Sequence, residues 1–258
     1  MAACAAVTWV LDLDGVVWLA DEPIPGAADA VAKLRARGER VVFATNFSGP
    51  LLAEHEAKLA AMGIPAEGDV LTSSMAAAGL VEPGERVLVV GGPGIVEAMT
   101  DRGAEPVEVG AASSGDVDVD VVAVGLTRAF DYEMMRVASR AVRRGARLLG
   151  TNDDATFPTP DGPVPGAGSL LAAVAYASGA TPVVAGKPHP PIADLVRAVG
   201  GPGGTVVGDR PDTDGALARQ VGYRFALVLT GVTHPDDLPV TPEPDVIADS
   251  LAALVERG

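Results

Sequence analysis

The sequence contains very little cysteine, few aromatic residues and no excess of positive charge. Its 258 residues include one cysteine, and aromatic residues make up 4%. A single cysteine, Cys4, excludes a disulfide within the chain and a zinc site built from several cysteines. The formal net charge of −15 leaves no basic surface that would neutralise nucleic acid or an anionic membrane, so we expect neither as a partner.

Long hydrophobic runs are also missing. No uncharged apolar segment reaches the roughly 18 residues that a membrane-spanning helix needs. Asp12 and Asp14 interrupt the apolar stretch near the N-terminus, and no basic residue precedes it, so we expect no signal peptide. These absences favour a cytoplasmic enzyme.

The chain does have many short apolar runs that alternate with amphipathic segments. Such alternation is typical of an α/β fold with a parallel sheet. The predicted strands are 7–14, 40–45, 86–90, 119–125, 147–149, 205–208 and 224–229. The predicted helices are 27–37, 50–62, 71–80, 132–144, 169–177 and 250–257, with others that end near 102, 199 and 221.

Two turn-rich segments, 82–85 and 179–182, divide this pattern into two α/β regions, with the second inserted into the first. We therefore expect a core domain formed by residues 1–81 and 182–258, and an inserted domain formed by residues 82–181. The small, polar and acidic stretch 110–118 is expected to be a surface loop.

Two carboxylates stand at the end of the first apolar run. Strand side chains alternate, so a strand that continues to Asp14 would send Asp12 and Asp14 to the same side. Acids aimed together from a buried strand repel each other, and a hard divalent cation between them would relieve this. Gly15 permits a sharp turn directly afterwards. Two solvated acids at a strand end are the alternative.

Further polar residues follow other apolar runs of the strand type: Thr45 and Asn46, then Lys187 after 183–186, then Asp209 with Asp212 and Asp214. Ligands of parallel sheets bind beyond the carboxyl ends of the strands. The chain has three lysines against sixteen arginines, so a lysine in the sequence Gly-Lys-Pro favours a chemical role. An ordinary turn at 45–46 and a solvated strand end at Lys187 remain alternatives.

Four segments together resemble the haloacid dehalogenase-like hydrolases: DLDGV (12–16), FATN (43–46), GKPHP (186–190) and GDRPDTD (208–214). Each motif alone is weak or moderate evidence, but four in this order, each after a strand-like apolar run, are strong evidence. VAVGLTRAFDY (122–132), TNDDATFPTPDG (151–162) and PGAG (165–168) resemble the cap of subfamily IIA, which includes NagD-type, phosphoglycolate and 4-nitrophenyl phosphatases. The resemblance implies a Rossmann-like parallel-sheet core with an inserted α/β cap of the C2 type.

The resemblance also implies catalytic roles. Asp12 would attack phosphorus and form an aspartyl-phosphate, and Asp14 would act as general acid and then as general base. Mg²⁺ would be held by Asp12, the backbone carbonyl of Asp14 and Asp209, while Asp214 would hold a metal-bound water or orient Lys187.

Substrate contacts follow from the same resemblance. Thr45 and the Asn46 backbone would bind the phosphoryl oxygens, and Lys187 would balance the charge of nucleophile and phosphate. Arg128, Asn152 and Asp154 are candidates for contacting the leaving group from the cap. The subfamily commonly has Asn where this chain has Phe47, which leaves the choice of substrate open.

The expected function is Mg²⁺-dependent hydrolysis of a small phosphorylated metabolite, because a cap over the site implies small soluble phosphates. A phosphometabolite-binding protein with little turnover, and a phosphotransferase or mutase on the same fold, are the alternatives. Relatives often pair through their caps, which makes a homo-oligomer of that kind an expectation. His55 and His234 are expected at the surface.

Overall fold

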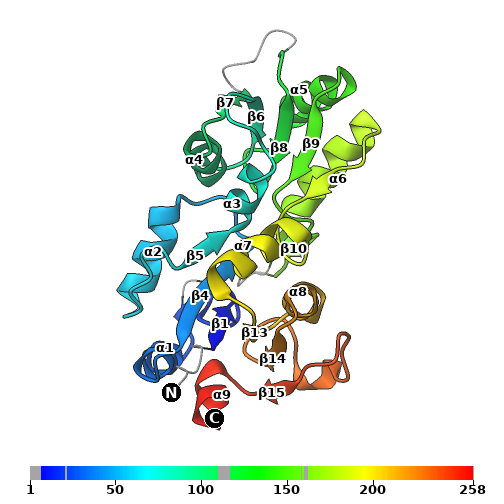
Figure 1. The fold of residues 1–258 in the computed structure, drawn as a ribbon. Helices are drawn as coiled ribbons and strands as arrows, with labels where there is room; N and C mark the ends of the chain where they lie inside the picture. Colours follow the sequence, from blue (N-terminus) through cyan, green and yellow to red (C-terminus); the bar gives the residue numbers. More distant parts are fainter. Residues whose placement is uncertain (1–6, 21, 110–116, 158, 160–161, 258) are drawn as a thin grey trace. The chain divides into compact units, whose positions relative to one another are not determined.

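A computed structural model of the protein describes residues 7–20, 22–109, 117–157, 159 and 162–257. The chain divides into two compact units (Figure 1). The first consists of Met1–Thr45, Ala53–Leu71 and Lys187–Gly258, and the second of Asn46–Leu52 and Thr72–Gly186. The domain boundaries expected near residues 82 and 181 stay a prediction.

The first unit contains a six-stranded sheet. Its strands are β1 (Thr8–Leu11), β4 (Arg40–Thr45), β5 (Val70–Thr72), β13 (Gly204–Gly208), β14 (Arg224–Val228) and β15 (Val246–Ala248). Their order across the sheet is β15-β14-β13-β1-β4-β5, and the pairings among β15, β14, β13, β1 and β4 are parallel. Val10 and Leu11 are fully buried although they point to opposite faces, as expected for a parallel strand covered on both sides. Because β13, β1 and β4 are neighbours, their carboxyl ends share one edge.

Helices cover this sheet. They are α1 (Ala27–Ala36), α2 (Leu52–Ala61), α7 (Pro190–Gly200), α8 (Ala216–Val221) and α9 (Leu251–Glu256). Helix α1 packs against β4 and α9, whereas α7 packs against β1, β4 and α8. The buried residues of α1, Ala27, Ala30, Val31 and Leu34, have the spacing of one helix face. Gly38 follows with φ of +78°, which is the left-handed conformation expected of a glycine after a helix.

Three short elements complete the first unit. A small antiparallel hairpin, β2 (Trp18–Leu19) and β3 (Glu22–Pro23), follows β1 after the turn at 12–17. A π-helical segment, η2 (Pro211–Gly215), leads from β13 into α8, and a 3-10 turn, η3 (Pro235–Asp237), lies in the segment after β14. The hairpin and η2 therefore both begin just beyond the carboxyl ends of central strands.

The second unit has a five-stranded sheet of its own, in the order β12-β9-β8-β6-β7, with parallel pairings throughout. Its strands are β6 (Arg86–Val90), β7 (Glu105–Glu108), β8 (Val121–Val124), β9 (Arg147–Gly150) and β12 (Val183–Val184), and a small hairpin joins β10 (Thr156–Phe157) to β11 (Val164–Pro165). Its helices are α3 (Ser73–Ala78), α4 (Pro93–Asp101), α5 (Tyr132–Arg143) and α6 (Ala167–Ser178). Helices α5 and α6 pack together on β8 and share one apolar core with β6 and β9.

The α/β class expected from the sequence is confirmed, but several elements differ from expectation. The segment predicted as a helix from residue 71 begins with strand β5, and the helix starts at Ser73, where the Thr72 side chain accepts a hydrogen bond from the Met75 N–H. Strands β7 and β15 were not predicted, because β7 is a four-residue strand that contains a proline and two acids, and β15 has three residues and follows a proline- and acid-rich stretch. His55 was expected at the surface, yet it is buried. The loop predicted at 110–118 lies, up to residue 116, outside the described residues.

Replacing Leu11 by Ala is expected to lower the free energy of unfolding by about 2–5 kcal/mol, because it leaves a cavity at a fully buried position of β1. Leu19→Ala is the matched control, since Leu19 is 45% exposed and its truncation should change stability by about 0.5 kcal/mol or less. Denaturant titration of both variants measures the difference. Equal losses of stability would contradict the placement of β1 at the centre of the core.

Candidate active site

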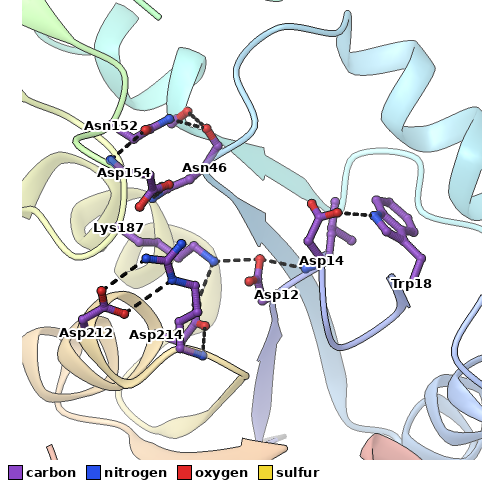
Figure 2. Close-up of polar contacts among 12 residues, drawn as sticks. Asp12, Asp14, Trp18, Asn46, Asn152, Asp154, Lys187, Asp212 and Asp214 are labelled. Atoms are coloured by element: carbon purple, nitrogen blue, oxygen red, sulfur yellow. Dashed lines mark hydrogen bonds and ion pairs between the residues drawn. The ribbon is translucent and has the colours of Figure 1, made fainter. Parts of the chain in front are cut away.

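A buried lysine lies between two aspartates at the carboxyl edge of the first sheet (Figure 2). The Nζ of Lys187 is 2.7 Å from Asp12 Oδ1 and 2.7 Å from Asp214 Oδ1. The three residues are almost fully removed from solvent, and Asp214 is 0% exposed. Asp12 follows β1, Asp214 belongs to η2 and Lys187 precedes α7, so three segments far apart in the sequence supply this ion-pair group.

The positive charge of Lys187 and the negative charges of Asp12 and Asp214 attract one another. Burial alone would lower the pKa of Lys187, but the carboxylates of Asp12 and Asp214 raise that pKa above its usual value. Lys187 is therefore a cation across the physiological pH range. Burial raises the pKa of Asp12, and the attraction of Lys187 opposes that rise. The Leu13 N–H also donates to Asp12 Oδ1 at 2.8 Å, which fixes the carboxylate from a second side.

A third buried acid, Asp209, adjoins this pair. Asp12, Asp209 and Asp214 each place one carboxylate oxygen within 4.8 Å of the others. Asp209 Oδ2 accepts a hydrogen bond from the Val232 N–H at 2.6 Å, whereas its buried Oδ1 has no hydrogen-bond partner among the described residues. A buried carboxylate oxygen without a donor is unusual, and a hard cation is the type of ligand that suits it.

Burial and the closeness of the three carboxylates raise the pKa values of Asp209 and Asp214. Burial, followed by the charges of Asp12 and Asp214, raises the pKa of Asp209 to about 8. Burial also raises the pKa of Asp214 to about 6, although Lys187 opposes the rise. One lysine thus faces three carboxylates, and the remaining negative charge favours either a proton or a metal ion.

Two glycines make room for Asp209. Gly15 has φ of +81°, and a Cβ there would lie 2.5 Å from the Asp209 Cγ. A Cβ on Gly231 would lie 2.0 Å from Asp209 Oδ2. Any side chain at either position would therefore push into the carboxylate. The Thr230 hydroxyl donates to the Gly15 carbonyl at 2.5 Å, which ties the turn after β1 to the segment after β14.

Asp14 has a different environment from Asp12. Strand β1 ends at Leu11, so strand alternation does not set the directions of the Asp12 and Asp14 side chains. The expectation that alternation sends both side chains to the same side was wrong. Figure 2 shows Asp12 directed toward Lys187 and Asp14 directed toward Trp18. The Trp18 indole Nε1–H donates to Asp14 Oδ1 at 2.9 Å. Asp14 does not contribute a carboxylate oxygen to the acidic cluster of Asp12, Asp209 and Asp214.

Two further residues singled out in the sequence belong to the first unit. Thr45 is the last residue of β4 and is buried. Asp212 is mostly exposed and pairs with Arg210, two residues before it, which agrees with a structural acid near the start of a helix. The site residues of the first unit thus come from the end of β4, from the segments that follow β1 and β13, and, for Lys187, from the segment before α7.

The second unit holds a separate polar network (Figure 2). The Asn46 Nδ2 donates to Asp154 Oδ2 at 3.0 Å, and the Asn152 Nδ2 donates to the Asn46 carbonyl at 2.6 Å.

The other residues singled out in this unit lie at its surface. Arg128 is exposed. Phe47 is 39% exposed and its ring stacks on that of Phe157, with ring centroids 6.4 Å apart. The substrate-binding roles expected for Asn46, Arg128, Asn152 and Asp154 stay predictions.

Sequence reasoning overlooked two contributors to the site. Trp18 lies in the hairpin after β1, and its only signal was its position four residues after Asp14. Gly231 and Val232 contact the Asp209 carboxylate, and they lie in a Pro- and Asp-rich segment for which the sequence predicts no element. The available signal was their place directly beyond β14, a strand of the same sheet.

Two family models match the chain. One, described as haloacid dehalogenase-like hydrolase, matches residues 9–105, and the other, described as HAD-hydrolase-like, matches residues 184–254. An acid sugar phosphatase of Staphylococcus saprophyticus is 34% identical over 241 residues, which cover 89% of each chain. The chain belongs to the haloacid dehalogenase-like hydrolase family. A 5′-nucleotidase of Bacillus subtilis is also 34% identical, over 255 residues and 96% of each chain.

Solved structures of family members have the same fold. A glycerol phosphate phosphatase of Mycobacterium tuberculosis, in complex with magnesium, aligns with a TM-score of 0.87 at 34% identity, over 96% of this chain and 76% of that one. The family, the subfamily and the phosphatase class expected from the sequence are confirmed. Among the described residues, no helix is long and apolar enough to cross a membrane.

Magnesium is expected to raise the melting temperature of the protein, and to do so more at pH 8 than at pH 6. The pKa values of Asp209 and Asp214 in the folded protein, about 8 and about 6, exceed the value of 3.8 for an unperturbed carboxyl. The folded state therefore holds protons that the unfolded chain has lost, so stability without metal falls as pH rises from about 4 to about 8. A cation that binds the ionised acids offsets this loss.

Asp209→Asn removes one of the buried charges and the expected metal ligand. The metal-free variant should melt above the metal-free wild type at pH 8, and magnesium should no longer raise its melting temperature. Asp236→Asn, at an exposed acid of the same unit, should leave the magnesium response intact. Thermal unfolding with and without Mg²⁺ tests both variants. If Mg²⁺ leaves the melting temperature of the wild type unchanged at both pH values, the expected metal site is contradicted.

Proposed function

We propose that the protein is a Mg²⁺-dependent phosphomonoester hydrolase that acts on small phosphorylated metabolites through a phosphorylated Asp12. The observation that carries the proposal is the buried Lys187 between Asp12 and Asp214, beside Asp209 with its unsatisfied oxygen. A nucleophilic carboxylate, a fixed cation and a place for a metal ion are the groups that phosphoryl transfer needs.

The donor set fits magnesium. All the candidate ligands are oxygens, the atoms that Mg²⁺ prefers, and Asp209 Oδ1 is buried without a donor. We propose that Asp12, Asp209 and the Asp14 carbonyl hold the ion, with Asp214 in its surroundings. Bound there, the ion supplies positive charge that neutralises the phosphoryl oxygens.

The first step transfers the phosphoryl group to Asp12. A carboxylate oxygen of Asp12 forms a bond to phosphorus as the bond between phosphorus and the ester oxygen breaks. Asp14, as the protonated acid, gives its proton to the departing oxygen, so the leaving group is released as a neutral alcohol. Separate environments for Asp12 and Asp14, one against Lys187 and the other against Trp18, support this division of roles.

The second step releases phosphate. Asp14, now a carboxylate, removes a proton from a water molecule whose oxygen attacks phosphorus. The bond between phosphorus and Asp12 then breaks, which restores the nucleophile and leaves Asp14 protonated for the next cycle. Inorganic phosphate is the second product.

Lys187 and Thr45 would stabilise the charge that moves in both steps. Lys187 already contacts Asp12, so its ammonium group offsets negative charge on the nucleophile and on an approaching phosphate without rearrangement. We propose that Asp214 orients Lys187, because its Oδ1 accepts a hydrogen bond from the lysine while its Oδ2 accepts one from the Arg210 N–H at 3.2 Å. The Thr45 hydroxyl is proposed to bind a phosphoryl oxygen.

The proposed substrates are small phosphomonoesters. The relatives described above are an acid sugar phosphatase, a 5′-nucleotidase and a glycerol phosphate phosphatase, whose substrates share one phosphate ester on a small molecule. That shared chemistry supports the substrate class for this chain. Comparing the rates on sugar phosphates, nucleoside monophosphates and glycerol phosphate would rank these candidates.

The wild type is expected to release phosphate from 4-nitrophenyl phosphate only when Mg²⁺ is present. Asp12→Asn should abolish turnover, because the amide is a poor nucleophile, while Asp236→Asn should keep the wild-type rate. Steady-state assays of 4-nitrophenol and phosphate measure this. Asp12→Asn protein that turns over at the wild-type rate would refute the proposed nucleophile.

Lys187→Met is expected to lower kcat by about 10²–10³, the cost of removing one fixed group that stabilises transition-state charge. Lys33→Met is the matched control, because the Lys33 side chain is 52% exposed and pairs with Glu256 at the surface. Thermal melting of each variant establishes that it is folded. A folded Lys187→Met enzyme with the kcat of the control would remove Lys187 from the mechanism.

A further inference from the structure

Asp14, the proposed proton carrier, accepts a hydrogen bond from a tryptophan, Trp18, that has no role in the reaction steps described above. Trp18 lies in β2, four residues after Asp14, and its indole N–H donates to Asp14 Oδ1 at 2.9 Å. Figure 2 shows the indole beside the aspartate, on the side away from Lys187. Trp18 is 2% exposed, so the indole side of this part-buried hydrogen bond is shielded from water.

The position of Trp18 is itself fixed. The Trp18 carbonyl accepts a hydrogen bond from the Gly15 N–H at 2.6 Å, which closes the turn that carries Asp14. The ammonium of Lys58, from α2, lies 4.3 Å from the centre of the Trp18 ring, in the range of a cation–π contact. Lys58 also donates to the Ala20 carbonyl at 2.9 Å, so it joins the ring to the backbone of the same hairpin.

We propose that Trp18 is a positioning residue that orients the Asp14 carboxylate for proton transfer to the leaving group, and that Lys58 holds the Trp18 ring in place. The proposal rests on the proposed role of Asp14. The indole N–H anchors Oδ1 and thereby fixes the direction of Oδ2. Proton transfer requires hydrogen-bond reach, and a small misplacement of a catalytic group costs much of its effect.

A leaving-group comparison separates this role from a merely structural one. A 4-nitrophenolate ion is a weak base and departs with little help from an acid, whereas an alkoxide needs the proton of Asp14. Trp18→Phe removes the N–H donor and keeps an aromatic ring for Lys58. We expect its kcat/KM to fall about tenfold more for glycerol 3-phosphate than for 4-nitrophenyl phosphate, in line with the loss of one hydrogen bond to a charged group.

Two further variants complete the test. Trp9→Phe is the matched control, because the indole of Trp9, the other tryptophan in the sequence, also donates to a carboxylate of the first unit, that of Glu39. It should change kcat/KM for the two substrates by the same factor. Lys58→Met keeps Trp18 and its hydrogen bond, and should shift the ratio of the two kcat/KM values in the same direction as Trp18→Phe, by a smaller factor.

The outcomes separate this inference from the proposed function. If the wild type hydrolyses both esters and Trp18→Phe lowers both kcat/KM values equally, or changes neither, the positioning role is overturned while the phosphatase proposal stands. If the wild type hydrolyses neither ester, the proposed function fails and the role of Trp18 fails with it. A selective loss on the alkyl ester in Trp18→Phe and Lys58→Met, absent from Trp9→Phe, supports the proposal.

Discussion

The ion pairs of the buried Lys187 with Asp12 and Asp214 are the interaction on which the rest of the site depends. An isolated ammonium group or carboxylate is costly to bury, and each of these groups is tolerated because the others are present. The arrangement remains unbalanced, since Asp209 brings a third carboxylate to a single lysine. That imbalance favours a further positive charge, either a proton or the proposed metal ion.

Sheet topology brings these charges together. Asp12 and Asp209 are almost two hundred residues apart in sequence, but β1 and β13 are adjacent parallel strands that end at the same edge. The turns beyond those strands then give the aspartates different hydrogen-bond partners. The π-helical turn η2 directs Asp214 back to Lys187, while the hairpin after β1 turns Asp14 toward Trp18. Gly15 and Gly231 keep the space around Asp209 free of side chains.

Much of the fold and of the candidate site was predictable from the sequence, and the features that were not predictable have physical causes. Apolar runs such as those in β4 and β13 predict strands, and the polar residues at their ends stand out from those runs. Short strands such as β5 and β15 have too few residues for a period and are defined by their neighbours in the sheet. The period-two argument for Asp12 and Asp14 failed because β1 ends before them. The contact of Gly231 with Asp209 is a tertiary one that no local pattern encodes, and the hydrogen bond from Trp18 to Asp14 depends on the turn after β1, which has no period.

The central claim is that Asp12 carries the phosphoryl group between the two steps. Acid quenching of the enzyme during turnover of a phosphate-labelled ester, followed by peptide mapping, tests this most directly. We predict label on the peptide that contains Asp12, present with Mg²⁺ and absent from Asp12→Asn. Label on a different residue, or none at all while hydrolysis proceeds at a normal rate, would contradict it.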